Sequence, residues 1–172
     1  MSWNEIQKRA IEFSKEWENE SSEKAESQTF WNEFFNIFGL SRKTRASFEA
    51  PVRKLGDKKG FIDLFWKETV LVEHKSRGED LESAYEQGLD YFPGISEEEL
   101  PKYIFVSDFA NFKLHNLELG EQFEFSIEEL YKNIHLFDFI GGFKKHVIAD
   151  GPPVNIKAAI LMGRLHDALK DS

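Results

Sequence analysis

Two adjacent apolar segments, residues 60–66 and 69–75, constrain the fold of this chain more than any other feature. Each has the length and the β-branched and aromatic residues of a strand, and the short interval between them predicts a hairpin. Charged residues nevertheless lie in both segments, with Asp63 in the first and Glu73 and Lys75 in the second. Because a buried charge is costly unless it is paired or bound to a metal, these residues either face water or form a site.

The length of the hairpin loop decides whether Asp63 and Glu73 can meet, because side chains alternate between the two faces of a strand. Directly opposed residues of a hairpin point to the same face. A two-residue loop would oppose Asp63 to Val72 and would place Glu73 on the other face. A three-residue loop would instead oppose Asp63 to Glu73. A site at these residues therefore requires an odd-numbered loop or a bulge near residues 67–69.

Two carboxylates on one face repel each other at close range, and a divalent cation removes that repulsion. Carboxylate and carbonyl oxygens together with water suit Mg²⁺, and the backbone carbonyl of His74 is a further candidate ligand. A bound Mg²⁺ can activate water and stabilise the charge that develops on a phosphodiester. Lys75 would position the attacking water or balance phosphate charge. In a chain with 31% charged residues, Asp63, Glu73 and Lys75 could also be surface ion pairs.

The net charge of −9 is unusual for a free-standing nucleic-acid-binding protein, but the charge is unevenly distributed. Residues 78–100 contain eight acidic residues and no Lys or Arg, whereas residues 41–60, just before Asp63, are predominantly basic. These cations would contact a nucleic-acid backbone or belong to an ordinary solvated loop. The candidate DNA-binding residues are Arg42, Lys43, Arg45, Arg53, Lys54, Lys58 and Lys59.

The hydrophobic pattern predicts further strands and helices around the hairpin. We expect strands over residues 46–52, 101–108 and 111–117, and helices over residues 5–17, 21–39, 79–92, 125–136 and 154–172. The helix over 79–92 is long enough to connect two parallel strands, whereas the hairpin supplies antiparallel ones. The chain is therefore predicted to be an α/β protein with a small mixed sheet flanked by helices.

The size and composition of the chain predict one domain with a real core, because 172 residues include 17 Phe and 4 Trp. The absence of cysteine excludes disulfides and cysteine–zinc sites and fits a reducing compartment. No apolar segment approaches the ~20 residues that span a membrane, and the N-terminus does not resemble a signal peptide. We therefore expect a soluble, cytoplasmic protein that does not bind membranes.

The order of helix, strands, Asp63, Glu73 with Lys75, helix and strand resembles the PD-(D/E)XK nuclease superfamily. The resemblance implies that Asp63 and Glu73 bind the metal and that all three residues are catalytic. Gln87 and Tyr91 are similar to the Q-x-x-x-Y motif of RecB-like nucleases, and they lie one turn apart on one face of the expected helix. These two residues are therefore expected to support the site.

The same resemblance implies further acidic residues at the site, because an acid of the first helix often joins the metal in these families. Glu26 and Glu33 are the candidates, and the sequence does not decide between them. Glu49, in the strand expected over 46–52, is another candidate contributor. The implied cofactor is Mg²⁺, for which Mn²⁺ can substitute.

Residues 26–117 are similar to the N-terminal nuclease domain of MmeI-like restriction–modification enzymes, and residues 158–172 resemble the start of their helical spacer. Those enzymes continue into an S-adenosylmethionine-dependent DNA methyltransferase and a target-recognition domain, which are absent from these residues. A break at Gly151, Pro152 and Pro153 gives the expected boundary. We expect a nuclease domain over residues 1–150 and the start of the spacer, a C-terminal helical extension, over 151–172.

The resemblance implies a Mg²⁺-dependent DNA endonuclease module, the N-terminal fragment of a type II restriction–modification enzyme. Its expected partners are double-stranded DNA and the missing methyltransferase and recognition domains, and S-adenosylmethionine would bind only the methyltransferase. Double-strand cleavage needs two active sites or one used twice, so a transient dimer on DNA is also expected. The alternative is a catalytically silent domain of the same fold that makes protein or DNA contacts, since a fold alone does not settle function.

Overall fold

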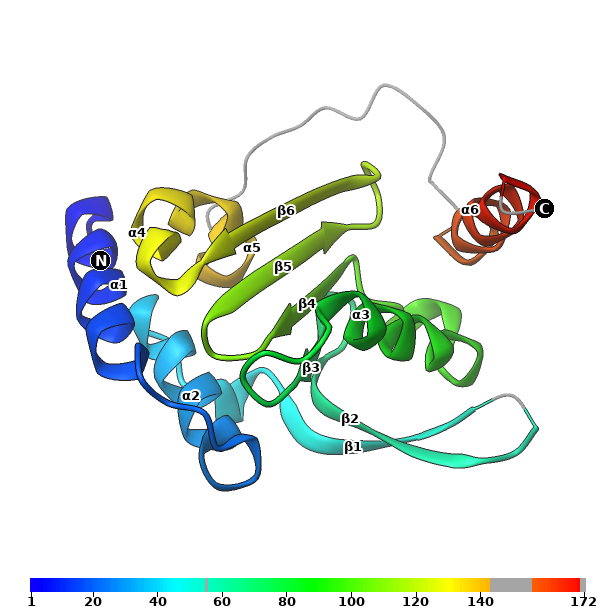
Figure 1. Ribbon diagram of the computed structural model, residues 1–172, viewed down its shortest axis with the longest axis horizontal. Helices are drawn as coiled ribbons and strands as arrows, with labels where there is room; N and C mark the ends of the chain where they lie inside the picture. Colours follow the sequence, from blue (N-terminus) through cyan, green and yellow to red (C-terminus); the bar gives the residue numbers. More distant parts are fainter. Residues whose placement is uncertain (55, 143–155, 171–172) are drawn as a thin grey trace.

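The computed structural model describes residues 1–54, 56–142 and 156–170 (Figure 1). In this part of the chain, six strands form one sheet whose spatial order follows the sequence, from β1 at one edge to β6 at the other. The neighbours β3 and β4 are parallel, and the other neighbouring pairs are antiparallel. The predicted mixed α/β sheet is therefore confirmed. The strands are β1 (Ser47–Arg53), β2 (Lys59–Trp66), β3 (Val70–His74), β4 (Tyr103–Ser107), β5 (Asn111–Asn116) and β6 (Glu121–Ser126).

Helices cover both faces of the sheet, as predicted (Figure 1). Two of the helices begin at capping side chains: Ser2 accepts a hydrogen bond from the Glu5 N–H at the start of α1, and Asp80 accepts from the N–H groups of Glu82 and Ser83 at the start of α3. The helices are α1 (Trp3–Trp17), α2 (Glu23–Ile37), α3 (Leu81–Asp90), α4 (Leu130–Asn133), α5 (Asp138–Gly141) and α6 (Ile156–Lys170). Short 3₁₀ turns lie at Arg42–Thr44, Phe92–Gly94, Glu97–Glu99, Ile127–Glu129 and Ile134–Phe137.

Two hydrophobic clusters lie on the two faces of the sheet. One joins α1, α2, α4 and α5 to the sheet, and the fully buried rings of Phe30, Trp31 and Phe34 lie within it. Burial of each such side chain contributes about 2–3 kcal/mol. The other cluster joins α3 to Leu71 and Ile104 of the two parallel strands. Because side chains alternate along β3, the face that carries Leu71 also carries Glu73.

The helix predicted over residues 125–136 is wrong at its start, because residues 121–126 form β6. Phe123 and Phe125 alternate with polar residues and pair with Leu114 and Phe112 of β5. Gly120, at φ +67°, lies in the turn that joins the two strands. After the strand, 3₁₀ turns interrupt the helical segments up to residue 141. The alternation of Phe123 and Phe125 was the signal of a strand.

The C-terminal helix α6 confirms the predicted helical extension and contacts α3. Arg164 reaches Glu86 at 3.0 Å and Asp90 at 3.3 Å, and Lys157 donates to the carbonyl of Ile95 at 3.0 Å. On the same helix, the apolar side chains of Leu161 and Leu165 are exposed. The predicted boundary at residues 150–151 lies outside the described residues. Among the helices described, none is long and apolar enough to cross a membrane.

Candidate active site

The hairpin between β2 and β3 has the three-residue loop that a site at Asp63 and Glu73 requires. Trp66 pairs with Val70 and Leu64 pairs with Val72, so residues 67–69 form the loop. Glu68 adopts a left-handed conformation at φ +61°, which turns the chain within this short loop. The register therefore brings Asp63 opposite Glu73, as the three-residue alternative predicts.

The two carboxylates contact each other's strands. The backbone N–H of His74 donates to Asp63 Oδ2 at 2.7 Å, and the N–H of Asp63 lies 3.4 Å from Glu73 Oε1. The Glu73 side chain is 1% exposed, and Asp63 is half-buried. Both carboxyl groups therefore lie on the α3 face of the sheet, with little water around them.

Burial and mutual repulsion raise the pKa of both acids. Burial is the larger cause for Glu73, the charge of Asp63 adds to it, and the pKa rises to about 9. Burial likewise raises the pKa of Asp63 to about 6, with further repulsion from Glu49 and Glu23. At neutral pH the pair therefore retains a proton on Glu73, which a divalent cation would displace.

The environment of Glu73 fits a cation. Its Oε2 atom is buried and has no hydrogen-bond partner, which is costly for an ionised carboxylate and would be relieved by a metal ion. Within the described residues, no three His, Cys, Asp or Glu side chains are grouped to hold a metal. The site therefore offers two carboxylates, and a hard cation that retains several water ligands matches such a site. The carbonyl of His74 as a further ligand stays a prediction.

A chain of hydrogen bonds joins the other predicted site residues. Lys75 Nζ donates to Gln87 Oε1 at 2.8 Å, and Gln87 Nε2 donates to the hydroxyl of Tyr91 at 3.0 Å. That hydroxyl donates to the carbonyl of Phe61 at 2.9 Å, two residues before Asp63. Burial is the main cause that raises the pKa of Tyr91 to about 12, so its hydroxyl stays protonated. The hydrogen bonds thus connect α3 to β2, which carries Asp63, and to Lys75 directly after β3.

Gly88 allows α3 to approach the sheet closely enough for this chain of hydrogen bonds. A Cβ atom at Gly88 would lie 3.1 Å from Leu71 Cδ2 and 3.3 Å from Ile104 Cγ2, which is tighter than ordinary contact. Gly88 follows Gln87 directly, so the close packing of Gly88 on the sheet also keeps Gln87 within hydrogen-bond distance of Lys75.

Glu26 and Glu33, the candidate acids for the metal site, both lie on α2. The carboxylate of Glu33 accepts a hydrogen bond from Trp17 Nε1, at the end of α1, at 2.8 Å. Glu26 is half-buried, but no hydrogen bond in the described chain links its side chain to Asp63, Glu73 or Lys75. Sequence reasoning missed Glu23, whose Oε2 accepts from Ser76 Oγ at 2.9 Å and whose charge raises the pKa of Asp63.

Glu49 lies beside Asp63 on the neighbouring strand. The pairs Phe48–Leu64 and Ala50–Ile62 flank it, so the register places Glu49 opposite Asp63. Glu49 has a φ of +50°, a strained conformation for a residue with a Cβ atom. Its charge contributes to the raised pKa of Asp63, so Glu49 and Glu23 are the further acids near this pair.

His74 faces away from Glu73, because side chains alternate along β3. Trp31 Nε1 donates to His74 Nδ1 at 3.1 Å, and the ring centroid of Phe109 lies 4.2 Å from that of His74. Burial lowers the pKa of His74 to about 3, so the ring is neutral. The His74 side chain is therefore a core group, and only its backbone borders the two carboxylates.

The predicted DNA-binding residues do not form one patch. Arg42 is held by Asn32 Oδ1 at 3.1 Å and by the Ala46 carbonyl at 2.9 Å, while burial lowers its pKa. Arg45 lies over the ring of Trp66, 5.8 Å from its centroid, and Lys43 is exposed. The other four lie at the end of the β1–β2 hairpin, which extends beyond the rest of the sheet (Figure 1). They are Arg53, which pairs with Asp57, and Lys54, Lys58 and Lys59.

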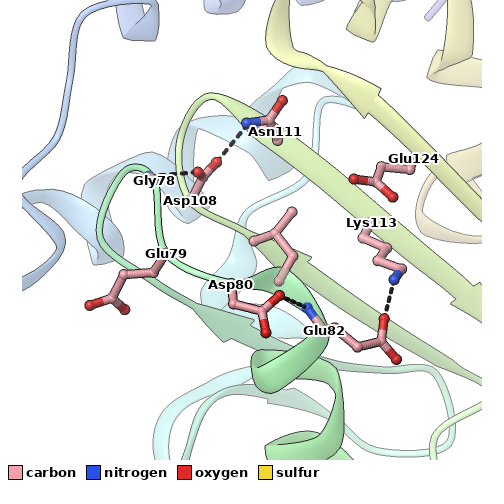
Figure 2. A pocket seen from close by; sticks show the side chains of 9 residues that line it. Gly78, Glu79, Asp80, Glu82, Asp108, Asn111, Lys113 and Glu124 are labelled. Atoms are coloured by element: carbon pink, nitrogen blue, oxygen red, sulfur yellow. Dashed lines mark hydrogen bonds and ion pairs between the residues drawn. The ribbon is translucent and has the colours of Figure 1, made fainter.

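A pocket of about 410 Å³ lies beside this site, between the start of α3 and strands β5 and β6 (Figure 2). Asp108 and Asp80 lie in it, but both cap backbone N–H groups: Asp108 accepts from Gly78 and Asn111, and Asp80 accepts from the start of α3. Lys113 pairs with Glu82. These groups hold the turn before α3 in place, and the pocket contains none of the predicted site residues.

Comparisons with known proteins found one matching family model and a similar solved structure. The family model described as "MmeI, N-terminal domain" matches residues 8–172. The comparison with curated proteins gives no match. Among solved structures, a chain in the cryo-EM structure of a DrdV–DNA complex is similar, with 16% sequence identity and a TM-score of 0.48. The similarity covers 84% of this chain and 14% of that chain, so the present chain spans a small part of that protein.

Proposed function

Because this chain belongs to the family of MmeI N-terminal domains, we propose that it is a metal-dependent nuclease module that hydrolyses phosphodiester bonds in DNA. One observation carries the proposal: Asp63 and Glu73 lie side by side, and Glu73 Oε2 is buried without a hydrogen-bond donor. If Glu73 were part of a structural ion pair, a cationic side chain would donate a hydrogen bond to Oε2. A metal site instead requires an oxygen atom that no protein group occupies.

The proposed metal ligands are Asp63, Glu73 and the backbone carbonyl of His74. Oxygen donors and remaining water ligands favour Mg²⁺, with Mn²⁺ as a substitute. When bound, such an ion supplies an activated water molecule and stabilises negative charge on the phosphate. Repulsion from Glu23 and Glu49 on Asp63 would add to the attraction for a cation.

In this proposal, Lys75 orients the nucleophile. Gln87 holds its Nζ atom with one hydrogen bond, which leaves two N–H groups for a water molecule or a phosphate oxygen. Gln87 is a positioning residue, because it acts through Lys75. Tyr91, whose hydroxyl is bonded to Gln87 and to the Phe61 carbonyl, anchors Gln87 to β2.

The proposed substrate is double-stranded DNA, and the exposed cations of the β1–β2 hairpin would contact its phosphates. The resemblance to MmeI-like enzymes adds the remaining partners: a methyltransferase domain with bound S-adenosylmethionine, a target-recognition domain and a transient dimer on DNA. In this proposal α6 is the beginning of the helical spacer, and its contacts with α3 would join the spacer to the helix that carries Gln87.

A plasmid-nicking assay tests the proposal. We expect the wild type to nick supercoiled DNA in the presence of Mg²⁺ or Mn²⁺ and Asp63→Asn to lose nicking, because the variant keeps the shape of the side chain and removes its charge. Asp57→Asn is the matched control, since Asp57 is an exposed acid of the neighbouring hairpin turn. Metal binding without nicking in the wild type would contradict the proposal and favour the catalytically silent alternative.

A further inference from the structure

Lys54 differs from the other cations of the β1–β2 hairpin in its position. It follows directly after β1, and its backbone N–H donates to the carbonyl of Lys58 to close the hairpin turn. Its side chain is half-buried, whereas Arg53, Lys58 and Lys59 are exposed. The Nζ atom lies 4.7 Å from the ring centroid of Tyr91, over the residue that anchors Gln87. Lys54 therefore points toward the candidate active site.

The path of the Lys54 side chain is shaped by Gly60 of β2. A Cβ atom at Gly60 would lie 2.9 Å from Lys54 Cε and 2.9 Å from Tyr91 Cε1. The φ of Gly60 lies outside the left-handed region, so its backbone does not require glycine. Glycine is required at residue 60 because there is no room for a side chain, which would separate the lysine from the tyrosine ring.

The Lys54 ammonium is available for a ligand. Throughout the described residues, it has no hydrogen bond and no ion pair, whereas the half-buried Lys75 and Lys113 are bonded to Gln87 and Glu82. Its charge nevertheless acts on the site, because Lys54 and Lys75 each lower the pKa of Glu73 against the effect of burial. The charges of two lysines thus act on the same carboxylate, Lys54 from directly after β1 and Lys75 from directly after β3.

We propose that Lys54 is a second phosphate-binding lysine of the active site, which together with Lys75 holds oxygen atoms of the phosphodiester that is cut. The inference rests on the proposed nuclease function. Asp63 and Glu73 lie at the reaction site, and the charges of Glu49 and Glu23 also act on Asp63, so nearby lysine side chains would reduce the repulsion of a phosphate. A lysine ammonium supplies three donors to phosphate oxygens. Lys54 therefore acts on the charge that develops during cleavage, and the exposed hairpin cations act on the rest of the DNA.

Single-turnover cleavage at saturating DNA separates these two roles. We expect Lys54→Met, which keeps the apolar stem against Tyr91, to lower the cleavage rate constant about 100-fold. The affinity for the same DNA, measured by fluorescence anisotropy in EDTA, should fall by no more than about fivefold, the effect of one lost phosphate contact. Lys132→Met is the matched control, because Lys132 also lies over a tyrosine ring, on α4 at the opposite face. It should change neither quantity.

Gly60→Ala tests position without changing charge. The added methyl group should displace the Lys54 ammonium from Tyr91, so we expect slow cleavage with metal-free DNA affinity close to that of the wild type. Thermal unfolding of each variant verifies that the fold is retained. Normal cleavage by Gly60→Ala, together with slow cleavage by Lys54→Met, would show that only the total charge matters and would overturn the assigned position.

A second readout does not depend on turnover. Reductive ¹³C-methylation keeps the lysine charge, and the Lys54 methyl resonance should be displaced upfield by the Tyr91 ring and absent in Lys54→Met. Titration of metal-free protein with a short DNA duplex should shift this resonance, and the Lys132 resonance should stay in place. A fixed Lys54 resonance, or wild-type cleavage by Lys54→Met, would refute the inference while nicking by the wild type upholds the proposed function. Absence of nicking in the wild type would refute both.

Discussion

Replacing Glu73 with glutamine should remove the pH dependence that this residue gives to the stability of the metal-free protein. The pKa of Glu73 is 4.5 in a water-exposed chain and about 9 in the fold, so the folded state binds one more proton between these values. Stability is therefore fully present below the lower pKa and is lost as the pH rises toward the upper one. The loss is about 1.4 kcal/mol per pH unit, or about 2 kcal/mol between pH 7 and pH 8.5.

This pH window isolates Glu73 from the other shifted groups. The pKa of Asp63 rises only to about 6, and burial lowers those of His74 and His115 to about 3 and about 4 from an ordinary value of 6.5, so these three groups contribute much less than Glu73 to the pH dependence above pH 7. Urea unfolding in EDTA at several pH values measures the slope. Wild type should lose stability with rising pH, and Glu73→Gln should not.

The control and the metal dependence complete this test. Glu16→Gln, at an exposed position of α1, should keep the slope of the wild type. Saturating Mg²⁺ should oppose the loss, since it binds the ionised carboxylates, and at 100 times its Kd it would add about 2.7 kcal/mol. Equal slopes for wild type and Glu73→Gln would refute the raised pKa of Glu73 and the argument for a cation that rests on it.

Three further predictions follow from the same contacts. Calorimetric Mg²⁺ affinity should increase with pH toward pH 9, because the ion must displace the proton held by Glu73; a constant affinity would contradict this. Gly88→Ala should destabilise the protein by about 1–3 kcal/mol in thermal unfolding, since its methyl group would press on Leu71 and Ile104; an unchanged melting temperature would disprove the tight packing. Gln87→Leu should leave Mn²⁺ binding intact and slow nicking at least about tenfold by freeing Lys75, and wild-type nicking would refute the positioning role.

The hairpin could be predicted from the sequence because the period of two in a strand leaves few alternatives. Once residues 60–66 and 69–75 are strands, the loop length alone decides whether Asp63 meets Glu73. The sequence left that length open, and the left-handed Glu68 settles it. Gln87 and Tyr91 were predictable as a pair for a similar reason, because one helical turn separates them.

The contributions of Glu23 and Lys54 could not be predicted in the same way, and Glu49 could be named only as a candidate, because all three depend on tertiary packing. Glu23 approaches Asp63 because α2 begins near Ser76, which no local pattern encodes. The side-chain direction of Glu49 depends on an unusual φ in the middle of a strand. In the sequence, Lys54 cannot be distinguished from its basic neighbours. In the structure it differs from them because its side chain packs beside Gly60 and over the Tyr91 ring.

Calorimetric titration of Mn²⁺ into metal-free wild type, Asp63→Asn and Glu73→Gln tests the central claim most directly, that Asp63 and Glu73 together bind one divalent cation. The account predicts saturable binding of one ion per chain in the wild type and loss of that binding in each variant, with Asp57→Asn unchanged. Absence of binding in the wild type, or equal binding in all four proteins, would contradict the claim.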